Sequence, residues 1–368
     1  MPDISANFAK RRQRYRKLLR TIGATSALIT DETNVSYLTG FQGDSSYLWL
    51  DDKRELLLSD SRYSTQIQEE CPELDVALRD SRINIQQLAV QEIKKTATKS
   101  VAFENQNIQK WVYDLLAGGL NSDLVPADGL VEKLRAVKDK TELKKIRSAI
   151  GIAERSFQVI RSQITAEQTE LQIAHNLEHQ IRQFGGTRCA FDPIVGVGPR
   201  GALPHGKPSN KQIHEAPFVL IDWGAQFDGY LSDLTRILVT GKISPKLRKI
   251  HNLVLKAQLA AIRKVRAGAK LIDVDRAARK TIEDGGFGKK FGHGLGHGFG
   301  MKIHEHPFLT PTANGVLETG MVITIEPGIY LPQWGGVRIE DDLLVTADGC
   351  EVLTNAPKEL DQCIVDMR

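Results

Sequence analysis

Glycine occupies every second position from Gly292 to Gly300, inside the stretch FGHGLGHGFGMKIHEHP at residues 291–307. A helix here would contain five glycines, each costing up to about 1 kcal/mol relative to alanine. We therefore predict an extended or irregular path. On an extended path the alternate residues from Phe291 to Phe299 share one face, and the bare glycines allow another part of the chain to approach closely.

Four of the nine histidines fall in this stretch, namely His293, His297, His304 and His306. A glycine-rich loop with solvated histidines is one interpretation. Clustered histidines are more typical of a metal or acid–base site. Such a site also needs carboxylates, which the rest of the chain has to supply.

The composition excludes several classes of protein. The chain has 368 residues, enough for two domains, and its net charge of +4 argues against an obligate nucleic-acid partner. The sequence contains no apolar run of membrane-spanning length and no secretory signal, so we expect no membrane contact. Four scattered cysteines without a C-x-x-C pair indicate free thiols in a reducing compartment, and we expect a cytoplasmic protein.

Residues 1–135 predict an α/β domain with a supporting or oligomerising role, because short apolar strands alternate with helical patterns and histidine is absent. The first helix, over 8–22, places its apolar residues on one face and arginines such as Arg11 and Arg12 on the other. Its basic run, 10–17, fits nucleic-acid binding or, more commonly, a solvated helix face.

Residues 140–368 predict an α+β domain in which helices pack on an antiparallel sheet. Capping boxes at Asp139–Glu142 and Thr165–Gln168 open two helices, and Ser244-Pro245 opens a third. A fourth helix covers 272–283. Strand pairs lie between and after the helices, and we place the domain boundary at 135–140.

Two glycine motifs resemble nucleotide-binding loops. Residues 196–201 match G-x-G-x-x-G, and residues 201–207 match G-x-x-x-x-G-K. A dinucleotide fingerprint needs a helix directly afterwards, but prolines crowd this stretch, and Pro208 replaces the hydroxyl residue of a P-loop. We reject both nucleotide interpretations. The candidate functional residue here is His205, fixed in a stiff turn between Pro204 and Gly206.

Carboxylates end two apolar strands. Asp222 ends one run, Asp228-Gly229 is a hairpin-turn signal, and Asp233 lies on the returning strand. In such a hairpin Asp222 and Asp233 are cross-strand or diagonal neighbours. Glu326 and Glu340 repeat the arrangement around a second turn-like stretch at 332–336.

Two interpretations fit these acids. They could form structural ion pairs with Arg236 and Arg338. Alternatively, the four carboxylates and His297 could bind two divalent ions, a ligand set that suits hard to borderline metals. Two such ions about 3.5–4 Å apart activate water and polarise a carbonyl, which is hydrolytic chemistry.

The set Asp222, Asp233, His297, Glu326 and Glu340, with the motifs ALPHGKPS, HGLGHGFGMKIHE, IEPGIY and GVRIEDD, resembles the creatinase/aminopeptidase ("pita-bread") superfamily of metallopeptidases. The stretch NVSYLTGFQG at 34–43 resembles the N-terminal domain of its Xaa-Pro aminopeptidase and Xaa-Pro dipeptidase (prolidase) branch. The resemblance implies a creatinase-like α/β N-terminal domain followed by a pita-bread catalytic domain with an antiparallel sheet.

The resemblance also implies roles for the site residues. Asp222 would hold one metal, His297 and Glu326 the other, and Asp233 and Glu340 would bridge both. Glu326 would also act as general base. The remaining residues would serve the substrate or support the site: His205 and His304 at the substrate carbonyl, His293 in the pocket, and Arg338 and Tyr330 behind it.

The function implied is hydrolysis of the bond between an N-terminal residue and proline in a peptide, as in an Xaa-Pro aminopeptidase. An Xaa-Pro dipeptidase is the nearest alternative. A metal-independent hydrolase of the creatinase kind and a non-peptidase binding protein on the same fold are further alternatives, but the complete ligand set argues against both. Manganese is the metal expected first, with cobalt, zinc or iron as alternatives, and the resemblance implies a homodimer.

Overall fold

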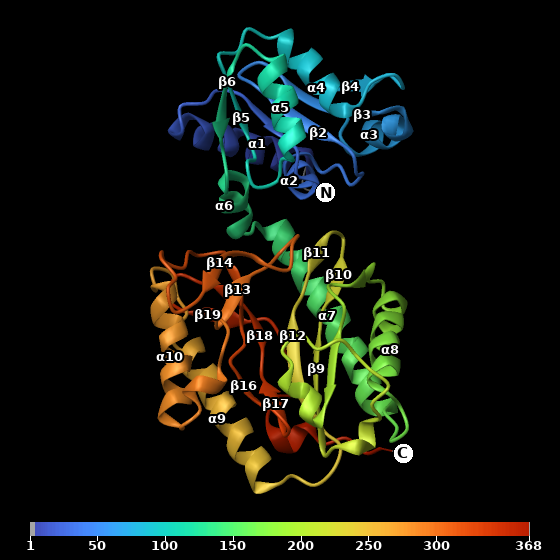
Figure 1. Cartoon of the computed structure of the whole chain (residues 1–368), viewed down its shortest axis with the longest axis vertical. Coiled ribbons are helices and arrows are strands. Elements are labelled where there is room, and N and C mark those ends of the chain that lie inside the picture. The colour runs from blue at the N-terminus through green and yellow to red at the C-terminus, as the bar shows by residue number, and fades with distance from the viewer. Residues whose placement is uncertain (1–3, 368) are drawn as a thin grey trace. The chain divides into compact units, whose positions relative to one another are not determined.

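The computed structural model describes residues 4–367, and the chain forms two compact units, one ending at Arg135 and one beginning at Ala136 (Figure 1). The first unit contains a six-stranded mixed sheet in the order β4-β3-β2-β1-β5-β6. Its strands are β1 (Ala27–Ile29), β2 (Tyr47–Leu50), β3 (Glu55–Asp60), β4 (Asp75–Arg79), β5 (Ser100–Phe103) and β6 (Asp123–Pro126). Its helices are α1 (Ile4–Thr21), α2 (Glu32–Thr39), α3 (Ser64–Glu70), α4 (Ile85–Lys94) and α5 (Lys110–Gly119), and α6 (Leu130–Ala136) follows.

Two arginines of α1 contradict the predicted solvated face, whereas Lys10, Arg14 and Lys17 of the basic run are exposed. Arg12 is buried, with Nε 2.6 Å from Glu55 Oε2 and Nη1 donating to the Leu38 carbonyl at 2.9 Å. Arg11 is also buried, and its guanidinium lies 4.1 Å from the centre of the Tyr37 ring. Arg11 and Arg12 therefore tie α1 to α2 and β3, because buried guanidinium groups are stable only when they are paired and hydrogen-bonded.

Replacing Arg12 should therefore destabilise the first unit. We expect Arg12→Met to lower the free energy of unfolding by about 3 kcal/mol, since Glu55 and the Leu38 carbonyl lose a buried partner. The exposed pair Arg20–Asp52, at 3.4 Å, provides the control, and Arg20→Met should cost less than about 1 kcal/mol. Urea unfolding of both variants measures the difference. Equal costs would contradict the burial argument.

The second unit combines four long helices with antiparallel strand pairs. The helices are α7 (Lys140–Gln163), α8 (Glu170–Gln183), α9 (Pro245–Ile262) and α10 (Leu271–Asp284). Strands β8 (Ile194–Val197), β9 (Phe218–Trp223) and β12 (Leu234–Val239) form a sheet in the order β12-β9-β8. A five-stranded sheet, β14-β13-β15-β18-β19, consists of β13 (Gly296–Gly298), β14 (Glu305–Leu309), β15 (Val322–Ile325), β18 (Asp341–Val345) and β19 (Cys350–Val352).

Two smaller sheets complete this unit. One pairs β16 (Gly328–Leu331) with β17 (Gly335–Arg338), and the other joins β7 (Arg188–Cys189), β10 (Ala225–Phe227) and β11 (Tyr230–Leu231). The chain also contains short 3-10 helices, at Ser61–Tyr63, Gly198–Ala202, Ile213–Glu215, Gly288–Lys290 and Leu360–Cys363. No described helix is both long and apolar enough to cross a membrane.

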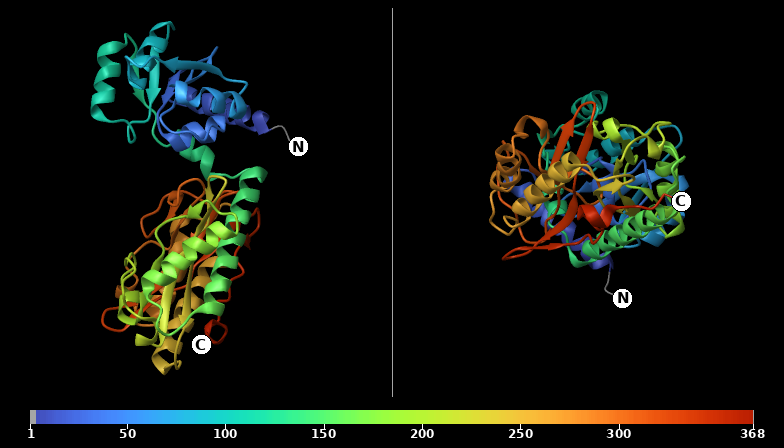
Figure 2. Two further views of the ribbon diagram at one scale, coloured as in Figure 1. Left: turned by 90° about the vertical axis from the view of Figure 1, so that its right-hand side faces the viewer. Right: turned by 90° about the horizontal axis from the view of Figure 1, so that it is seen from below.

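Side chains of β9 alternate between two hydrophobic cores. Phe218 and Leu220 pack in the core built with α9 and α10, whereas Val219 and Ile221 pack in the core built with α7 and α8. Figures 1 and 2 show the two helix pairs on opposite sides of the strands. Successive side chains of a strand point to opposite faces, so Asp222 shares the face of Phe218 and Leu220.

The helix starts test the capping predictions. The capping boxes predicted at Asp139 and the Ser244-Pro245 start are both confirmed. The box predicted at Thr165–Gln168 is wrong as a helix start: α8 begins four residues later, with a reciprocal box between Thr169 and Gln172. Residues 165–168 and 169–172 both begin with threonine and end with glutamine, so the sequence does not show which of the two stretches caps the helix.

The alternating-glycine stretch is a regular strand over Gly296–Gly298 alone. A Cβ at Gly296 would lie 2.1 Å from the Thr324 carbonyl oxygen, and one at Gly298 would lie 2.2 Å from that of His306. The predicted close approach is therefore confirmed at these two positions. The glycines allow β13 to lie between β14 and β15 and to present His297 from the middle of the sheet.

His251 on α9 links stability to pH. It is buried, its Nδ1 has no hydrogen-bond partner among the described residues, and burial lowers its pKa to about 4 from 6.5. Between these values the unfolded chain binds a proton that the folded protein does not, so stability falls as the pH falls from about 6.5 to 4. We expect His251→Phe to remove up to about 3 kcal/mol of this decline. Urea unfolding at pH 7 and 4.5 measures it, and an unchanged decline would contradict the assignment.

Candidate metal centre and active site

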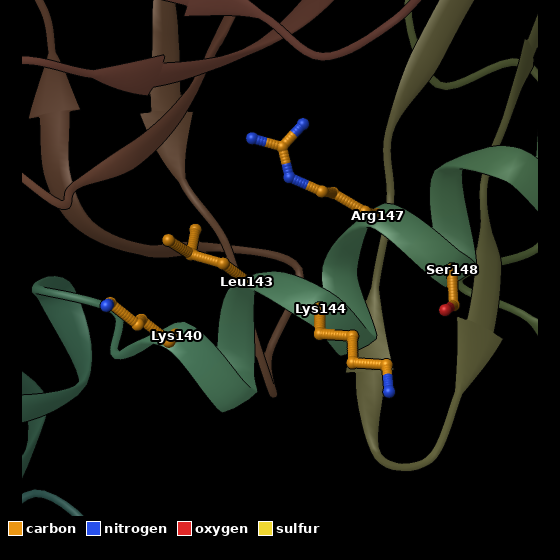
Figure 3. Close-up of a pocket in the computed structure, with 5 residues that line it drawn as sticks. All are labelled: Lys140, Leu143, Lys144, Arg147 and Ser148. Carbon is orange, nitrogen blue, oxygen red and sulfur yellow. The ribbon is translucent and has the colours of Figure 1, made fainter.

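Two cavities in the second unit differ in what lines them. A pocket of about 410 Å³ on α7 is lined by Lys140, Leu143, Lys144, Arg147 and Ser148, all from one helix (Figure 3). A cavity of about 960 Å³ is lined by residues from α8, several strands and the loops between them. It contains nine of the ten predicted site residues: His205, Asp222, Asp233, His293, His297, His304, Glu326, Arg338 and Glu340. The convergence of so many titratable groups makes the larger cavity the candidate active site.

Two strand pairs deliver the four carboxylates. In the β9–β12 pair Asp222 lies opposite Thr235, so Asp233 is its diagonal neighbour, as one of the two predicted arrangements had it. In the second pair Ile325 opposes Asp341 and Gly328 opposes Arg338. Glu326 and Glu340 therefore face each other where this hairpin passes from one sheet to the next. A bridge between Thr235 and Glu340 joins the two strand pairs.

The predicted metal ligands lie within ligand distance of one another. Asp222, Asp233 and Glu340 each offer a carboxylate oxygen, and these oxygens all lie within 4.8 Å of one another. His297 Nε2 lies 3.4 Å from Glu326 Oε1 and 3.7 Å from Asp233 Oδ2. Five residues separated by up to 118 positions in the sequence thus form one cluster.

The electrostatics of the cluster favour bound cations. Burial, followed by repulsion from Glu340 and Asp222, raises the pKa of Asp233 well above its usual value. Burial likewise raises the pKa of Glu326, to about 8. Arg338 pairs with Asp222 at 2.5 Å, yet Asp222 Oδ1 is buried without a hydrogen-bond partner among the described residues. Buried carboxylates that outnumber their cationic partner fit divalent metal ions.

The histidine tautomers fit the same interpretation. His297 Nδ1 donates to the Gly298 carbonyl at 3.1 Å, and burial lowers the pKa of His297 to about 4, so its Nε2 has a free lone pair. Neutral imidazole in this orientation is a metal ligand. His293 Nδ1 donates to the Gly294 carbonyl at 2.7 Å, which leaves Nε2 to accept from Tyr330 at 2.9 Å.

Tyr330, the tenth predicted residue, does not line the cavity and supports it from behind. Its hydroxyl oxygen accepts from Arg338 Nη1 at 2.8 Å.

The alternative interpretation of the acids as two structural ion pairs, with Arg236 and Arg338, fits only half of the arrangement. Arg338 pairs with Asp222, but Arg236 pairs with Asp341 at 2.6 Å, outside the four-carboxylate set.

Several supporting residues were not predicted. Thr235 Oγ1 donates to Glu340 Oε2 at 2.6 Å and accepts from Arg338 Nε at 2.9 Å. Thr324 Oγ1 accepts from the His297 amide at 3.1 Å, and Asp342 Oδ2 accepts from the Asp233 amide at 3.2 Å. A threonine near the end of an apolar strand is an ordinary strand residue, so its role depends on the cross-strand register, which the sequence does not show.

Comparisons with known proteins agree with this geometry. Residues 144–347 match the model of metallopeptidase family M24, and residues 11–137 match the creatinase/prolidase N-terminal domain. The chain is 34% identical over 349 residues to the uncharacterized peptidase YqhT of Bacillus subtilis, covering 95% of this chain and 98% of that relative.

Solved structures give the same result. An Xaa-Pro dipeptidase from Bacillus anthracis superposes with a TM-score of 0.92 at 36% identity, covering 96% of this chain and 99% of the other. An X-Pro aminopeptidase from Thermotoga maritima gives a TM-score of 0.87 at 34% identity, with 94% and 99% covered. The prolidase from Pyrococcus horikoshii gives 0.89 at 31% identity, with 95% and 99% covered.

Fold and site together define a metallopeptidase with an N-terminal domain of the creatinase/prolidase type. The chain belongs to metallopeptidase family M24, whose peptidases are dinuclear metal enzymes. The predicted resemblance and the predicted fold class, an α/β domain followed by a pita-bread domain, are confirmed.

The position of Thr235 yields a test of the metal centre. Thr235→Val keeps the shape of the side chain but leaves Glu340 and Arg338 without the hydroxyl. We expect the affinity for Mn²⁺ to fall about 10–100-fold, because groups that orient metal ligands typically contribute this much. Thr240→Val is the control, since Thr240 directly follows the same strand and its hydroxyl donates to the Ala216 carbonyl, away from the predicted ligands. Calorimetric titration of both apoproteins measures the affinities, and equal affinities would contradict the assignment.

Proposed function

We propose that the protein is an Xaa-Pro aminopeptidase, a metal-dependent exopeptidase that hydrolyses the bond between an N-terminal residue and proline. The observation that carries the proposal is the buried cluster of four carboxylates and a neutral His297 that opens into one cavity. A solved structure named for this activity, an X-Pro aminopeptidase, and one named for the nearest alternative, an Xaa-Pro dipeptidase, both match nearly the whole chain.

The chain's own residues have distinct parts in the reaction. Asp222, Asp233, His297, Glu326 and Glu340 would hold two divalent ions, which when bound polarise the scissile carbonyl and lower the pKa of water. Glu326 accepts a proton from the attacking water and transfers it to the departing prolyl nitrogen.

The remaining site residues act on the substrate or on the ligands. His205 and His304 both line the cavity, and they donate hydrogen bonds to the carbonyl oxygen as negative charge develops on it. His293 lines the cavity beside them. Arg338 fixes the orientation of Asp222, and Tyr330 in turn holds Arg338.

The cavity has room for a substrate longer than a dipeptide, as an aminopeptidase requires; the alternative is an Xaa-Pro dipeptidase. The cavity volume of about 960 Å³ lies at the upper end of the roughly 300–1,000 Å³ typical of small-molecule sites. Phe308, which is 39% exposed, provides an apolar wall on the same cavity. A longer peptide has room here, and an exposed phenylalanine is a suitable contact for its residues beyond proline. A non-peptidase binding protein is disfavoured, because the ligand set is complete.

Manganese is the metal we propose first, with cobalt, zinc or iron as alternatives, because oxygen ligands and one imidazole suit all of these ions. The substrate is a peptide with proline at its second position. A cytoplasmic location and a homodimer stay predictions from the sequence.

The proposal is tested with protein prepared in chelator and assayed with and without Mn²⁺. The substrates are an Xaa-Pro peptide of four residues, the Xaa-Pro dipeptide and an Xaa-Ala peptide. We expect cleavage of the Xaa-Pro peptide only with metal, with a higher kcat/KM than for the dipeptide. A preference for the dipeptide would establish the prolidase alternative, and cleavage of Xaa-Ala alone would contradict the proline specificity. Absence of both metal uptake and cleavage would overturn the peptidase assignment for this chain.

A further inference from the structure

Glu170, the first residue of α8, is a fully buried carboxylate outside the predicted metal ligands. Oε1 accepts from the Val197 amide at 2.8 Å. Oε2 accepts from Arg200 Nε at 2.7 Å, from the Ser209 amide at 2.8 Å and from the Ser209 hydroxyl at 2.7 Å. A buried carboxylate is costly unless it is paired and hydrogen-bonded, and here both oxygens are used to hold one loop.

The loop held by Glu170 carries the cavity segment 203–208. In the described chain, the hydrogen bonds of this segment to its surroundings both involve Arg200: the Leu203 amide donates to the Arg200 carbonyl at 3.0 Å, and Arg200 Nη2 donates to the Lys207 carbonyl. Arg200 in turn is held by Glu170, and Ser209 directly follows the segment. One carboxylate therefore fixes both ends of the segment.

The segment reaches the substrate cavity with little support of its own. Pro204, His205, Gly206, Lys207 and Pro208 all line the cavity. His205 and Lys207 are exposed, and Leu203 is 49% exposed. Because few buried contacts hold this stretch, its position depends on its anchored ends.

Close backbone packing fixes the preceding turn. A Cβ on Gly196 would lie 2.7 Å from the Gly201 Cα, and a Cβ on Gly336 would lie 1.9 Å from the Gly201 carbonyl oxygen. The 3-10 helix Gly198–Ala202 thus lies against β8 and β17. The glycines of the G-x-G-x-x-G pattern allow this packing. The hydrogen bonds of Glu170 to Val197 and Arg200 hold the same turn.

We propose that Glu170 is a positioning residue of the active site, which acts through Arg200 and Ser209 to hold His205 in place at the cavity. The inference rests on the proposed function for the role of His205, but the anchoring itself does not depend on activity. Glu170 touches neither the substrate nor the predicted metal ligands. Its effect on catalysis therefore has to disappear when His205 is removed.

The test is a double-mutant cycle with Glu170→Gln and His205→Ala. Glutamine keeps the volume and one acceptor for the Val197 amide, but its NH₂ group faces the donors of Arg200 and Ser209. We expect Glu170→Gln to lower kcat/KM on an Xaa-Pro peptide about 10–100-fold, as misplacement of a substrate-contacting group does. In the His205→Ala background the further loss should be less than about threefold, since residues that act through one another are not additive. Equal losses in both backgrounds would overturn the proposal.

Hydrogen–deuterium exchange gives a readout without activity. In Glu170→Gln, faster exchange should be confined to amides of residues 197–209, and the affinity for Mn²⁺ should be unchanged. Unchanged exchange in this segment would overturn the anchoring. If the wild type cleaves no Xaa-Pro peptide, the proposed function fails, and the exchange experiment still decides whether Glu170 anchors the segment.

Glu142→Gln is the matched control. Glu142 is also a buried glutamate in the first turn of a long helix, and it accepts from the Asp139 amide at 2.9 Å and the Tyr230 hydroxyl at 3.1 Å. It does not line the cavity. We expect this variant to lose stability without loss of kcat/KM; a loss equal to that of Glu170→Gln would show that general destabilisation is the cause. Should Glu170→Gln not fold, Ser209→Ala removes one of the same hydrogen bonds, and it should give a smaller loss that also disappears with His205→Ala.

Discussion

Four carboxylates share one buried space in this protein, and much of the second unit is arranged to hold them there. Burial, and after it their mutual repulsion, raises the pKa values of Asp233 and Glu340 well above the usual range. Ionised carboxylates this close together are stable only when cations compensate their charge. Arg338, which pairs with Asp222, supplies one such cation. The strands supply the constraint that keeps the acids together, because each carboxylate lies at the end of a paired strand whose neighbours are fully buried.

Close approach of backbones is the second requirement. β13 lies between two strands only because Gly296 and Gly298 lack side chains, and the turn before His205 packs on β17 through Gly201 and Gly336. Both glycine patterns were visible in the sequence; one was predicted to belong to a metal or acid–base site, and the other was rejected as a nucleotide-binding loop. In the structure they have the same physical purpose, which is to bring a histidine-bearing segment against the carboxylate-bearing strands.

The cluster of carboxylates could be predicted from the sequence because its spacing follows strand geometry. Asp222 and Asp233 lie on either side of a turn signal, and Glu326 and Glu340 repeat the pattern, so a two-residue period was enough to bring each pair together. What joins the two pairs was not visible. Thr235 bridges them through a register between strands far apart in sequence, and no local rule encodes such a register.

Two local predictions failed. Charge on a helix face is usually solvated, but Glu55 and the carbonyl of Leu38 pair with Arg12 and allow it to be buried. The helix start was placed at Thr165 rather than Thr169, which hid the position of Glu170 in the first turn of α8. A tertiary partner decides the burial of Arg12, and single-sequence patterns contain no information on such partners. The helix start is ambiguous because residues 165–168 and 169–172 have the same polar pattern.

The predicted metal ligands and the histidines proposed to contact the substrate are held in place in different ways. The five predicted ligands lie on or beside strands fixed by two hydrophobic cores, whereas the exposed His205 and His304 lie on connecting segments. Each of these segments is tied by a buried carboxylate: Glu170 holds the ends of the first, and Glu305, directly after His304, lies 3.3 Å from the buried Lys138. The ligands thus depend on the strand register for their positions, whereas the two histidine segments depend on these buried ion pairs.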